Sequence, residues 1–512
     1  MIERLLIANR GECARRIAQT SRRLGITPVV VYTSDDKNSL HARESGEAHE
    51  ISNYTDINSI IKIAKENGAD GIHPGWGFVS ENPNFARACE KEHIIFVGPS
   101  KDSMGKAGNK EKIKKIATDL GVPVIVSTPP NIRASRVAGW AQRNGLSDRE
   151  DSTPMMLKAA TSGGGNGNQI IWSLKDLGEA ITSVTKRAKS LGGGSKRVFM
   201  EHYLRNARHI EVQVLGDGSG HIIHLGTREC SVQANQQKII EEAPDSFLSQ
   251  DQQKLLYSYA LELAKAIEYS NAGTVEFLAE ANGNCFFMEF NPRLQVEHGV
   301  TELVTGLDLV EQQIRIAQGE RLTFRQKDIK FGGVALEARI NAQTIYPADP
   351  KKLMPSGGVV EKVIFPEGKG IRVDHSMYDG YGINPNYNPT QAKVMAWAPS
   401  REDAIEELRK ALGQFVVKGV EMNIPLLINI LCHPTFLEGQ HTTEFFGELL
   451  EELAEKEHSD RETAAAIGVS LALALQNRQR QEEVEVFSQG SLWRQAGRID
   501  QTTRGLNFRA RR

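Results

Sequence analysis

The chain has 512 residues, which is enough for about three domains at ~150 residues each. Its 62 Lys and Arg residues balance 64 Asp and Glu residues, and the formal net charge of -2 excludes the strong positive field that recruits nucleic acid or an anionic membrane. The five cysteines lie far apart without Cys-x-x-Cys spacing, which argues against a zinc site and a disulfide framework. No apolar run is long enough for a secretory signal or a membrane span, so a cytoplasmic protein is expected.

The N-terminal segment has the pattern of a β-α-β unit. Residues 4–8 are an apolar run too short for a helix, residues 12–24 have helical spacing, and residues 28–32 are apolar again. This order predicts parallel strands joined by a helix. The pattern continues through residues 59–67, 71–74, 85–92 and 94–97, so we expect a first unit over residues 1–113. No Gly-x-Gly-x-x-Gly follows the first strand, and nothing there indicates dinucleotide binding.

Three further units are expected. Residues 131–204 contain two predicted strands (154–159, 197–200), a glycine-rich segment (161–168) and a helix (174–189), and we expect this small unit to act as a lid. Residues 205–453 contain two hairpin turns (217–220, 282–283), two helices (250–268, 307–318) and a strand-rich stretch after Phe331. Residues 460–512 form a helical and basic C-terminal extension. The coarse fold class is mixed α/β.

An acidic hairpin is the most informative local pattern. Asn282-Gly283 predicts a two-residue turn, which places Ala281 opposite Asn284 and Glu276 opposite Glu289. From residue 288 to residue 297 polar and apolar side chains alternate, which predicts a strand with one polar face. Two carboxylates opposite each other on one sheet face repel unless a cation lies between them, and Mg²⁺ is a cation that carboxylates and phosphates hold together. The alternative is an amphipathic strand whose polar face is solvated.

A cation followed by glycines suggests a polyphosphate site. Lys158 ends an apolar strand, and unhindered backbone amides follow at Gly163, Gly164 and Gly165. The order differs from a Walker A loop, and a flexible surface loop is equally consistent with the spacing. Residues 199–204 leave the next strand with apolar and hydrogen-bonding groups suited to a purine, although a domain hinge explains them as well.

Three more strands carry charged residues on one face. His209, Glu211 and Gln213 alternate with apolar residues, and Lys238 lies two apolar residues before a pair of acids. Arg339 alternates with apolar neighbours on the same side as Glu337 and Asn341. These strands can line one cavity. A satisfied core histidine and ordinary salt-bridged strands are the alternatives.

Several longer motifs, in order over about residues 1–450, resemble the biotin carboxylase component of biotin-dependent carboxylases. They lie at residues 7–12, 73–82, 241–244, 289–298 and 338–342. The resemblance implies an α/β fold of the ATP-grasp type, with an N-terminal parallel-sheet (pre-ATP-grasp) domain, a small lid and a large C-terminal mixed α+β domain. It also implies an enzyme that carboxylates the ureido N1 of carrier-linked biotin, using bicarbonate, ATP and Mg²⁺ (or Mn²⁺).

The resemblance assigns roles residue by residue. The ATP contacts are Lys110, Lys158, the glycines 163, 164 and 165, Glu201, Leu204, His209, Gln233 and Glu276. The magnesium ligands are Glu276, Glu289 and Asn291, and the bicarbonate pocket is Lys238, Arg293, Gln295 and Val296. Glu297 matches the general base that deprotonates bicarbonate, and Arg339 matches the cation that stabilises the biotin enolate. Glu297, Arg339, Lys238 and Arg293 are thus the expected catalytic group.

The chain departs from the family pattern at several positions. Asn166 replaces an Arg of the glycine loop, and Ala234-Asn235-Gln236 replaces Arg-Arg-His. Both changes remove cationic groups near the polyphosphate, so weaker or altered ATP handling is expected. Asn109, Gly299 and residues 388–391 also differ, the last in a region that the family uses near its dimer contact.

The resemblance also implies partners. No Ala-Met-Lys-Met motif is present, so we expect a biotin carboxyl carrier protein and a carboxyltransferase on separate chains, in an oligomeric assembly. Residues 491–498 resemble a linker in acyl-CoA carboxylase α subunits, which favours an acyl-CoA acceptor. A non-catalytic scaffold paralogue, or an ATP-grasp ligase with another acceptor, remains an alternative.

Overall fold

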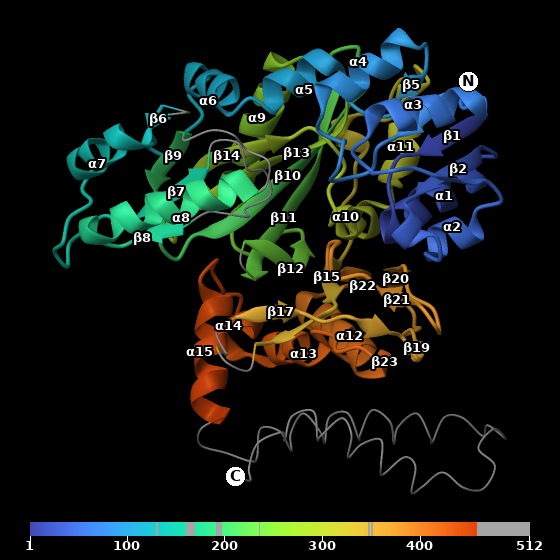
Figure 1. Cartoon of the computed structure of the whole chain (residues 1–512). Coiled ribbons are helices and arrows are strands. Elements are labelled where there is room, and N and C mark those ends of the chain that lie inside the picture. The colour runs from blue at the N-terminus through green and yellow to red at the C-terminus, as the bar shows by residue number, and fades with distance from the viewer. Residues whose placement is uncertain are drawn as a thin grey trace, which may run out of the picture.

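The computed structural model describes residues 1–129, 132–159, 169–190, 197–234, 236–346, 349 and 352–457. These residues form three sheet-based parts, with the N-terminal part and the lid at opposite ends of a central sheet and the C-terminal elements beneath it (Figure 1). Among the residues so described, no helix is both long and apolar enough to cross a membrane.

The N-terminal part is a five-stranded parallel sheet of order β3-β2-β1-β4-β5, which confirms the predicted parallel sheet. Leu5 and Ile7 of β1 pack into one apolar cluster and Leu6 into another, because successive side chains of a strand point to opposite faces. The elements are β1 (Arg4–Ile7), α1 (Gly11–Arg23), β2 (Thr27–Tyr32), α2 (Leu40–Glu44), β3 (Ala48–Glu50), α3 (Ile57–Glu66), β4 (Gly71–His73), α4 (Pro83–Lys91), β5 (Ile95–Phe96), α5 (Lys101–Ala107) and α6 (Lys110–Asp119).

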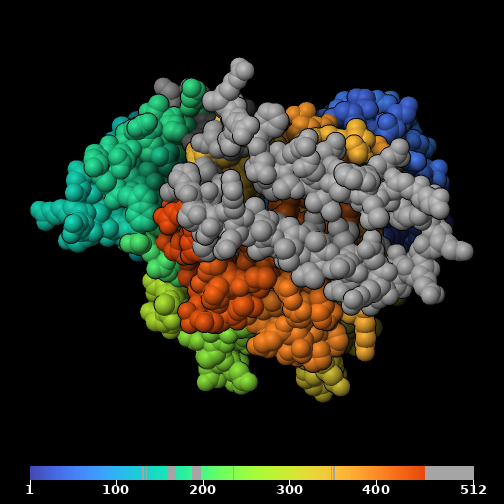
Figure 2. Space-filling model, turned by 90° about the horizontal axis from the view of Figure 1, so that it is seen from below, coloured from blue at the N-terminus to red at the C-terminus, as the bar shows by residue number. Residues whose placement is uncertain are grey.

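The lid is a four-stranded sheet of order β6-β9-β7-β8 with its own small core, which includes Val137, Leu157, Val184 and Met200. It projects from one side of the molecule (Figure 2). The strands predicted at 154–159 and 197–200 and the helix predicted at 174–189 are confirmed. The elements are β6 (Ile132–Arg133), α7 (Ala134–Arg143), β7 (Met155–Ala159), β8 (Gln169–Ile171), α8 (Leu177–Ser190) and β9 (Arg197–His202).

The central sheet has eight antiparallel strands in the order β14-β13-β10-β11-β12-β15-β22-β20. The helices predicted at 250–268 and 307–318 correspond to α9 (Gln250–Ala266) and α11 (Leu309–Ala317). The other elements here are β10 (Arg208–Gly216), β11 (Ile222–Ala234), β12 (Gln237–Ala243), β13 (Asn271–Ala279), β14 (Cys285–Asn291), α10 (His298–Thr305), β15 (Val334–Asn341), β20 (Ile371–His375), β22 (Thr390–Ala398) and α12 (Arg401–Gln414).

The C-terminal part buries the other face of β15 and β22 against α12 and α13, through residues such as Leu336, Val394, Leu408 and Leu427. Its remaining elements are short strands and helices: β16 (Gln343–Ile345), β17 (Leu353–Pro355), β18 (Gly358–Val359), β19 (Lys362–Ile364), β21 (Gly382–Ile383), β23 (Val416–Lys418), α13 (Ile424–Cys432), α14 (Pro434–Leu437) and α15 (Phe445–Glu457). Single 3₁₀ turns lie at Ser34–Asp36, Leu174–Asp176 and Gln326–Asp328.

The acidic hairpin has the predicted acidic pair but not the predicted turn. Glu276 lies opposite Glu289. Ala279, however, pairs with Cys285, and residues 280–284 form a longer loop in which Gly283 N donates to Glu280 O (2.8 Å). A register shift between Glu276 and Phe277 offsets the longer loop. The prediction of Ala281 opposite Asn284 is therefore wrong, and so is the strand to residue 297, because β14 ends at Asn291.

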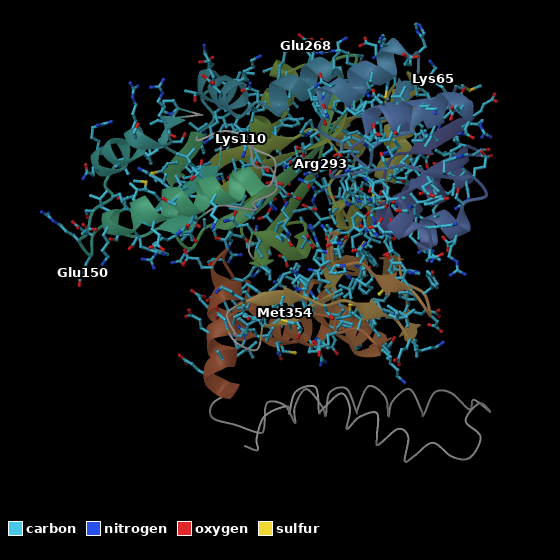
Figure 3. All side chains as sticks on the ribbon, viewed as in Figure 1. Lys65, Lys110, Glu150, Glu268, Arg293 and Met354 are labelled. Atoms are coloured by element: carbon cyan, nitrogen blue, oxygen red, sulfur yellow. The ribbon has the colours of Figure 1, made fainter. Side chains whose placement is uncertain are left out.

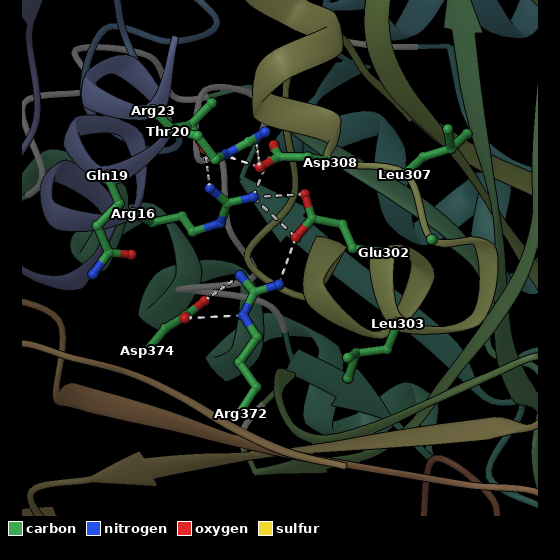
Figure 4. Close-up of a pocket in the computed structure, with 11 residues that line it drawn as sticks. Arg16, Gln19, Thr20, Arg23, Glu302, Leu303, Leu307, Asp308, Arg372 and Asp374 are labelled. Carbon is green, nitrogen blue, oxygen red and sulfur yellow. Dashed lines mark hydrogen bonds and ion pairs between the residues drawn. The ribbon is translucent and has the colours of Figure 1, made fainter. Parts of the chain in front are cut away.

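A buried ion network joins the N-terminal part to the rest of the chain. Arg16 of α1 lies 2.8 Å from Glu302 of α10, and Glu302 also lies 2.6 Å from Arg372 of β20. Arg372 in turn pairs with Asp374 (2.7 Å). These residues line a cavity of about 400 Å³ (Figure 4). Each of these two arginines and two acids has a partner of opposite charge, so the network links the two parts with its charges paired.

Candidate active site

Lys238 lies at the centre of a group of buried carboxylates. Its Nζ is 2.6 Å from Glu211, 3.0 Å from Glu276 and 2.6 Å from Glu297. Lys238 comes from β12, Glu211 from β10 and Glu276 from β13, so the sheet sets these three positions, while Glu297 directly precedes α10. All three carboxylates are buried. The structure thus brings together residues that the sequence places in separate motifs.

Arg339 joins this group from β15. Its Nη2 is 2.9 Å from Glu297 Oε2, and its Nε donates to Glu241 Oε1 at 2.6 Å. Glu297 is therefore shared between Lys238 through one oxygen and Arg339 through the other. A carboxylate with two charge-assisted partners is fixed in orientation.

A second buried arginine, Arg228 of β11, was missed by sequence reasoning. It lies directly opposite Glu211 on β10, and its Nε is 2.5 Å from Glu211. Its Nη atoms donate to Gln213 (2.7 Å), Thr301 (2.9 Å) and Thr274 (3.1 Å). Glu211 is therefore held between Arg228 and Lys238. The cross-strand Arg-Glu pair was the available signal, but it required the register of β10 and β11.

The expected bicarbonate residues lie beside this cluster. Arg293 donates to Glu81 (2.5 Å), to Gln295 (2.8 Å) and to Asn291 (3.2 Å), and it lies near the middle of the molecule (Figure 3). The side-chain amide of Gln295 donates to Glu276 (2.8 Å). The carbonyl of Val296 accepts from Lys393 at 2.7 Å, and this buried lysine was also missed.

The expected metal ligands are neighbours on two paired strands. The amide of Asn291 donates to Glu289 (3.3 Å), and Lys110 lies 4.0 Å from Glu289. Glu276 is bound instead by Lys238 and by His209 (3.2 Å). Each carboxylate of the opposing pair thus has a cation of its own. Two carboxylates and an amide oxygen are a donor set that suits Mg²⁺, so the residues fit the ion.

His209 and Gln233 extend the polar wall. Gln233 Nε2 lies 2.9 Å from His209 Nδ1, and ligand atoms of His209, Glu211 and Glu276 lie within 4.8 Å of one another. Sequence reasoning grouped Glu276 with Glu289 and Asn291 and did not predict this second set. Its carboxylates already bind Lys238, which places an ammonium where a cation is required.

Two of the expected nucleotide residues, Lys158 and Glu201, lie on paired strands of the lid. Lys158 of β7 is bonded to Glu201 of β9, and Lys114 of α6 lies 3.0 Å from the other oxygen of Glu201. Lys114 Nζ also lies 4.5 Å from the centre of the Phe199 ring. Sequence reasoning missed Lys114, because a lysine at helical spacing usually faces solvent.

Of the remaining expected nucleotide residues, Lys110 is exposed, Leu204 is half-buried, and the three glycines lie outside the described residues. The Lys110 side chain is 47% exposed and lies between the lid and the central sheet (Figure 3). Leu204 is half-buried just after β9. Gly163, Gly164 and Gly165 lie outside the described residues, as does Asn166.

The charges of the cluster decide its ionisation. Burial alone raises the pKa of Glu297, but Lys238, Arg339 and Arg228 outweigh burial and hold this pKa well below its usual range. For Glu201 burial is likewise outweighed, by Lys158 and Lys114, and the pKa is about 2. Burial prevails at Glu241, where Arg339 opposes it and Glu297 adds to it, and the pKa is about 7. The cluster therefore contains both ionised and proton-holding carboxyl groups at neutral pH.

The parallel N-terminal sheet, the small lid and the large antiparallel sheet with inward charges define an ATP-grasp enzyme, and three family models match the chain in this order. They are the biotin carboxylase N-terminal domain (residues 1–104), the carbamoyl-phosphate synthase L chain ATP-binding domain (residues 110–325) and the biotin carboxylase C-terminal domain (residues 337–448).

Relatives and solved structures agree with these matches. Biotin carboxylase 2 of Bacillus subtilis is 43% identical over 451 residues, which is 87% of this chain and 99% of the relative. The small subunit of 2-oxoglutarate carboxylase of Hydrogenobacter thermophilus is 39% identical over 477 residues, or 91% and 98%. A solved structure of the biotin carboxylase domain dimer of that carboxylase, with MgADP, ADP and bicarbonate, has a TM-score of 0.82 at 40% identity and covers 88% of this chain and 98% of its own.

The chain belongs to the biotin carboxylase family. It is an ATP-grasp ligase that forms a carbon-nitrogen bond, and ATP, Mg²⁺ and biotin are its cofactors and substrates.

Proposed function

We propose that this chain uses Glu297 as the base in the ATP-dependent carboxylation of biotin carried on a separate protein. The observation that carries this proposal is the position of Glu297, which is buried and bonded to Lys238 through one oxygen and to Arg339 through the other. One carboxylate thus lies between the bicarbonate-side lysine and the biotin-side arginine.

Glu297 is ionised at neutral pH, because Lys238, Arg339 and Arg228 hold its pKa low. An ionised carboxylate can accept the bicarbonate proton. The negative charges of bicarbonate and the nucleotide raise the pKa of a nearby carboxylate, so substrate binding makes Glu297 a stronger base than it is in the free enzyme.

Lys238, Arg293, Gln295 and the Val296 backbone form the proposed bicarbonate pocket. Arg293 is held by Glu81, whose side chain is 45% exposed and can yield the guanidinium to an anion. Placed in this way, deprotonated bicarbonate attacks the γ-phosphorus of ATP as a positioned nucleophile. This attack releases ADP and forms carboxyphosphate, which decomposes to CO₂ and phosphate. The phosphate takes the N1 proton of biotin, Arg339 pairs with the resulting anion, and N1 then attacks CO₂ to form the carbon-nitrogen bond.

The nucleotide is assigned to residues of the lid, of α6 and of the central sheet, with Lys110, Lys114, Lys158, Glu201, Leu204, His209, Gln233 and Glu276 as the described contacts or supports. Lys114 compensates for part of the cationic charge missing at residues 166 and 234–236. Glu276, Glu289 and Asn291 would hold magnesium, which would neutralise charge on the phosphates.

The units 1–113, 131–204, 205–453 and 460–512 are proposed as the domains of the chain. Biotin is proposed to arrive on a carrier protein and to leave for a carboxyltransferase on a further chain, in an oligomeric complex. An acyl-CoA acceptor is favoured by the resemblance of residues 491–498 to an acyl-CoA carboxylase linker. A similar relative is the propionyl-CoA carboxylase alpha chain of Ruegeria pomeroyi, although other relatives are pyruvate and 2-oxoglutarate carboxylases. A cytoplasmic location also remains a prediction.

ATP cleavage with and without bicarbonate, assayed with free biotin, biotinylated carrier and amine acceptors, tests the proposal. We expect cleavage to require bicarbonate and to rise with biotin only. Lys238→Met should abolish the bicarbonate dependence of ATP cleavage. Lys254 is an exposed lysine of α9, and Lys254→Met should behave like the wild type. A folded protein without turnover would favour a scaffold role, and turnover with amines would favour another ligase.

A further inference from the structure

Glu337 is a buried carboxyl group that the proposed mechanism does not use. It lies on β15 directly opposite Glu241 of β12, and its side chain is fully buried. Both of its oxygens lack a hydrogen-bond partner among the described residues, and so does Oε2 of Glu241. Residues directly opposite on antiparallel strands have Cβ atoms about 4.5–5.5 Å apart, so the two carboxyl groups are neighbours on one sheet face.

The cations around Glu337 already pair with other groups. Lys393, on β22, donates to the Val296 carbonyl (2.7 Å) and lies 3.5 Å from Glu12 of α1. Arg339, on the same strand as Glu337, is bonded to Glu241 and Glu297. Gly299 of α10 approaches Glu337 without offering a charge: a Cβ built on this glycine would lie 3.2 Å from Glu337 Oε2. No cation of the described residues therefore pairs with Glu337.

An unpaired buried carboxylate is too costly to remain ionised, and the usual outcome is protonation. Burial raises the pKa of Glu337 well above its ordinary value, Glu241 and Glu297 raise it further, and Lys393 and Arg339 oppose this incompletely. A neutral carboxylic acid differs from a carboxylate in one useful respect, because it has an O–H donor. Among the described residues, Oε2 of Glu241 is a buried acceptor that has no hydrogen-bond partner.

Glu241 uses its other oxygen to hold the biotin-side arginine. Arg339 Nε donates to Glu241 Oε1 at 2.6 Å, and the guanidinium also reaches Glu297 at 2.9 Å. A donor on Oε2 fixes the carboxylate plane of Glu241 and therefore the direction in which the Arg339 guanidinium points.

We propose that Glu337 is a positioning residue for biotin carboxylation: held as a neutral acid, it donates a hydrogen bond to the free oxygen of Glu241, which in turn orients Arg339. This inference rests on the function proposed for Arg339. It adds Glu241 and Glu337 to the residues on which biotin use depends, although neither touches substrate.

Two substitutions of Glu337 separate positioning from a passive buried acid. Glu337→Gln keeps a hydrogen-bond donor of similar size, whereas Glu337→Met keeps the volume but removes the donor. If Glu337 only fills space, Met is the better replacement, because apolar groups cost nothing to bury. If it positions Glu241, Glu337→Met raises the KM for biotin about tenfold, the scale of one hydrogen bond to a charged group, and Glu337→Gln restores it to within about twofold.

Glu242→Gln is the matched control. Glu242 is the next residue of β12, is equally buried, and bonds to Arg401 (2.9 Å) and Ser246 (2.8 Å) on the opposite face of the strand. We expect it to alter thermal stability without changing the KM for biotin. In Glu337→Met the biotin-dependent rate should be the activity that decreases. Bicarbonate-dependent ATP cleavage by the same variant serves as the reference that the enzyme is folded.

Infrared spectroscopy of the whole chain with ¹³C-labelled glutamate tests the neutral acid directly. A protonated-carboxyl band should be present at neutral pH in the wild type and in Glu242→Gln, and should be lost or reduced in Glu337→Gln. A wild type whose protonated-carboxyl band is unchanged by Glu337→Gln, or equal biotin KM values for the Gln and Met variants, overturns the inference. Absence of biotin-stimulated ATP cleavage in the wild type contradicts the proposed function instead, because the infrared result does not depend on turnover.

Discussion

Single residues of the site are arranged so that most buried carboxylates have a cation, and the two central cations, Lys238 and Arg339, each have more than one carboxylate. Lys238 bonds three acids, and Arg339 bonds two. Such sharing fixes side-chain directions before substrate arrives, which is the form of preorganisation that electrostatic catalysis requires. Glu337 is the exception within this cluster, and its neutral state follows from its lack of a cation.

Replacing Lys114 tests the nucleotide side of the site. Lys114→Met removes one of the two ammonium groups on Glu201, so the pKa of Glu201 should rise and the orientation of Lys158 should loosen. We expect the KM for ATP to rise about tenfold, the scale of one hydrogen bond between charged groups. Lys115→Met, on the exposed face of the same helix, is the control and should leave the KM for ATP as in the wild type. Equal values for both variants would exclude Lys114 from nucleotide binding.

The ionisation of Glu337 gives a pH dependence of stability. Because its folded pKa is raised, the stabilising contribution of the protonated group is complete below the unfolded value near 4.5 and is lost as the pH rises toward the folded pKa. Glu337→Gln cannot ionise, so its free energy of unfolding should gain on the wild type between about pH 5 and about pH 8. Urea unfolding at both pH values measures the free energy of unfolding of Glu337→Gln minus that of the wild type. This quantity should increase with pH, and a decrease would contradict the assignment.

Sequence patterns located part of this site and missed the rest for a physical reason. Lys238 and Arg339 were found because charged residues alternate with apolar ones on their strands. Arg228 and Lys393 were missed, because their acidic partners lie on other elements. The register of β10 and β11 brings Glu211 to Arg228, and the packing of helix α1 brings Glu12 to Lys393. The bicarbonate and base assignments, and Asn291 as a metal ligand, came from resemblance to a family, whereas the hairpin pattern had already indicated Mg²⁺ at Glu276 and Glu289.

At the scale of elements, the hairpin of β13 and β14 shows how a correct pair can follow from a wrong turn. The five-residue loop shifts the strand register by one residue relative to the predicted two-residue turn. The register shift between Glu276 and Phe277 cancels this offset, so Glu276 still lies opposite Glu289. Asn-Gly identifies a turn, but it does not reveal a bulge several residues away. The end of β14 at Asn291 was missed as well, since polar and apolar residues still alternate beyond it.

Helix α10 packs closely against β22 at Gly299, because glycine has no side chain there. An ideal Cβ at this position lies 2.3 Å from the sulfur of Met395. Gly299→Ala should therefore destabilise the protein by about 1–3 kcal/mol, the usual cost of overpacking, and Met395→Ala should relieve part of that cost. Thermal denaturation of the single and double variants measures both effects.

Gly447 of α15 is the matched control, because a Cβ there meets nothing within 4 Å. Gly447→Ala should stabilise the protein by about 0.4–1 kcal/mol, since it only reduces the entropy of the unfolded chain. Gly299→Ala with a similar stabilisation would contradict the packing of α10 against Met395.

At the scale of the whole molecule, an apolar cluster and an ion network connect the N-terminal sheet to the central sheet. The cluster joins Leu5 and Ile7 to Leu225 and Leu309. The network runs from Arg16 through Glu302 to Arg372. The parallel and antiparallel sheets were expected from sequence, but these contacts join segments about three hundred residues apart, so no local pattern could predict them.

Glu302→Gln tests this connection. Glu302 also accepts from the Leu309 amide (2.7 Å), so the change weakens three buried contacts and removes the carboxylate charge that Arg16 and Arg372 share, although Asp308 and Asp374 still pair with them. We expect a loss of about 3–5 kcal/mol in the free energy of unfolding, the cost of breaking a buried ion pair. Glu320→Gln removes only an exposed contact with Arg315, and it should change stability by about 0–1 kcal/mol. Similar losses for both variants would mean that the network does not join the two parts.

The most direct measurement of the central claim is the transfer of labelled carboxylate from ¹³C-bicarbonate to biotin by the full chain with ATP and Mg²⁺. We expect the wild type to form N-carboxybiotin and to release ADP in step with it. Glu297→Gln should lower the rate by at least about a hundredfold, the usual contribution of a general base, while remaining folded. Labelled carboxybiotin formed at the wild-type rate by Glu297→Gln would contradict the account.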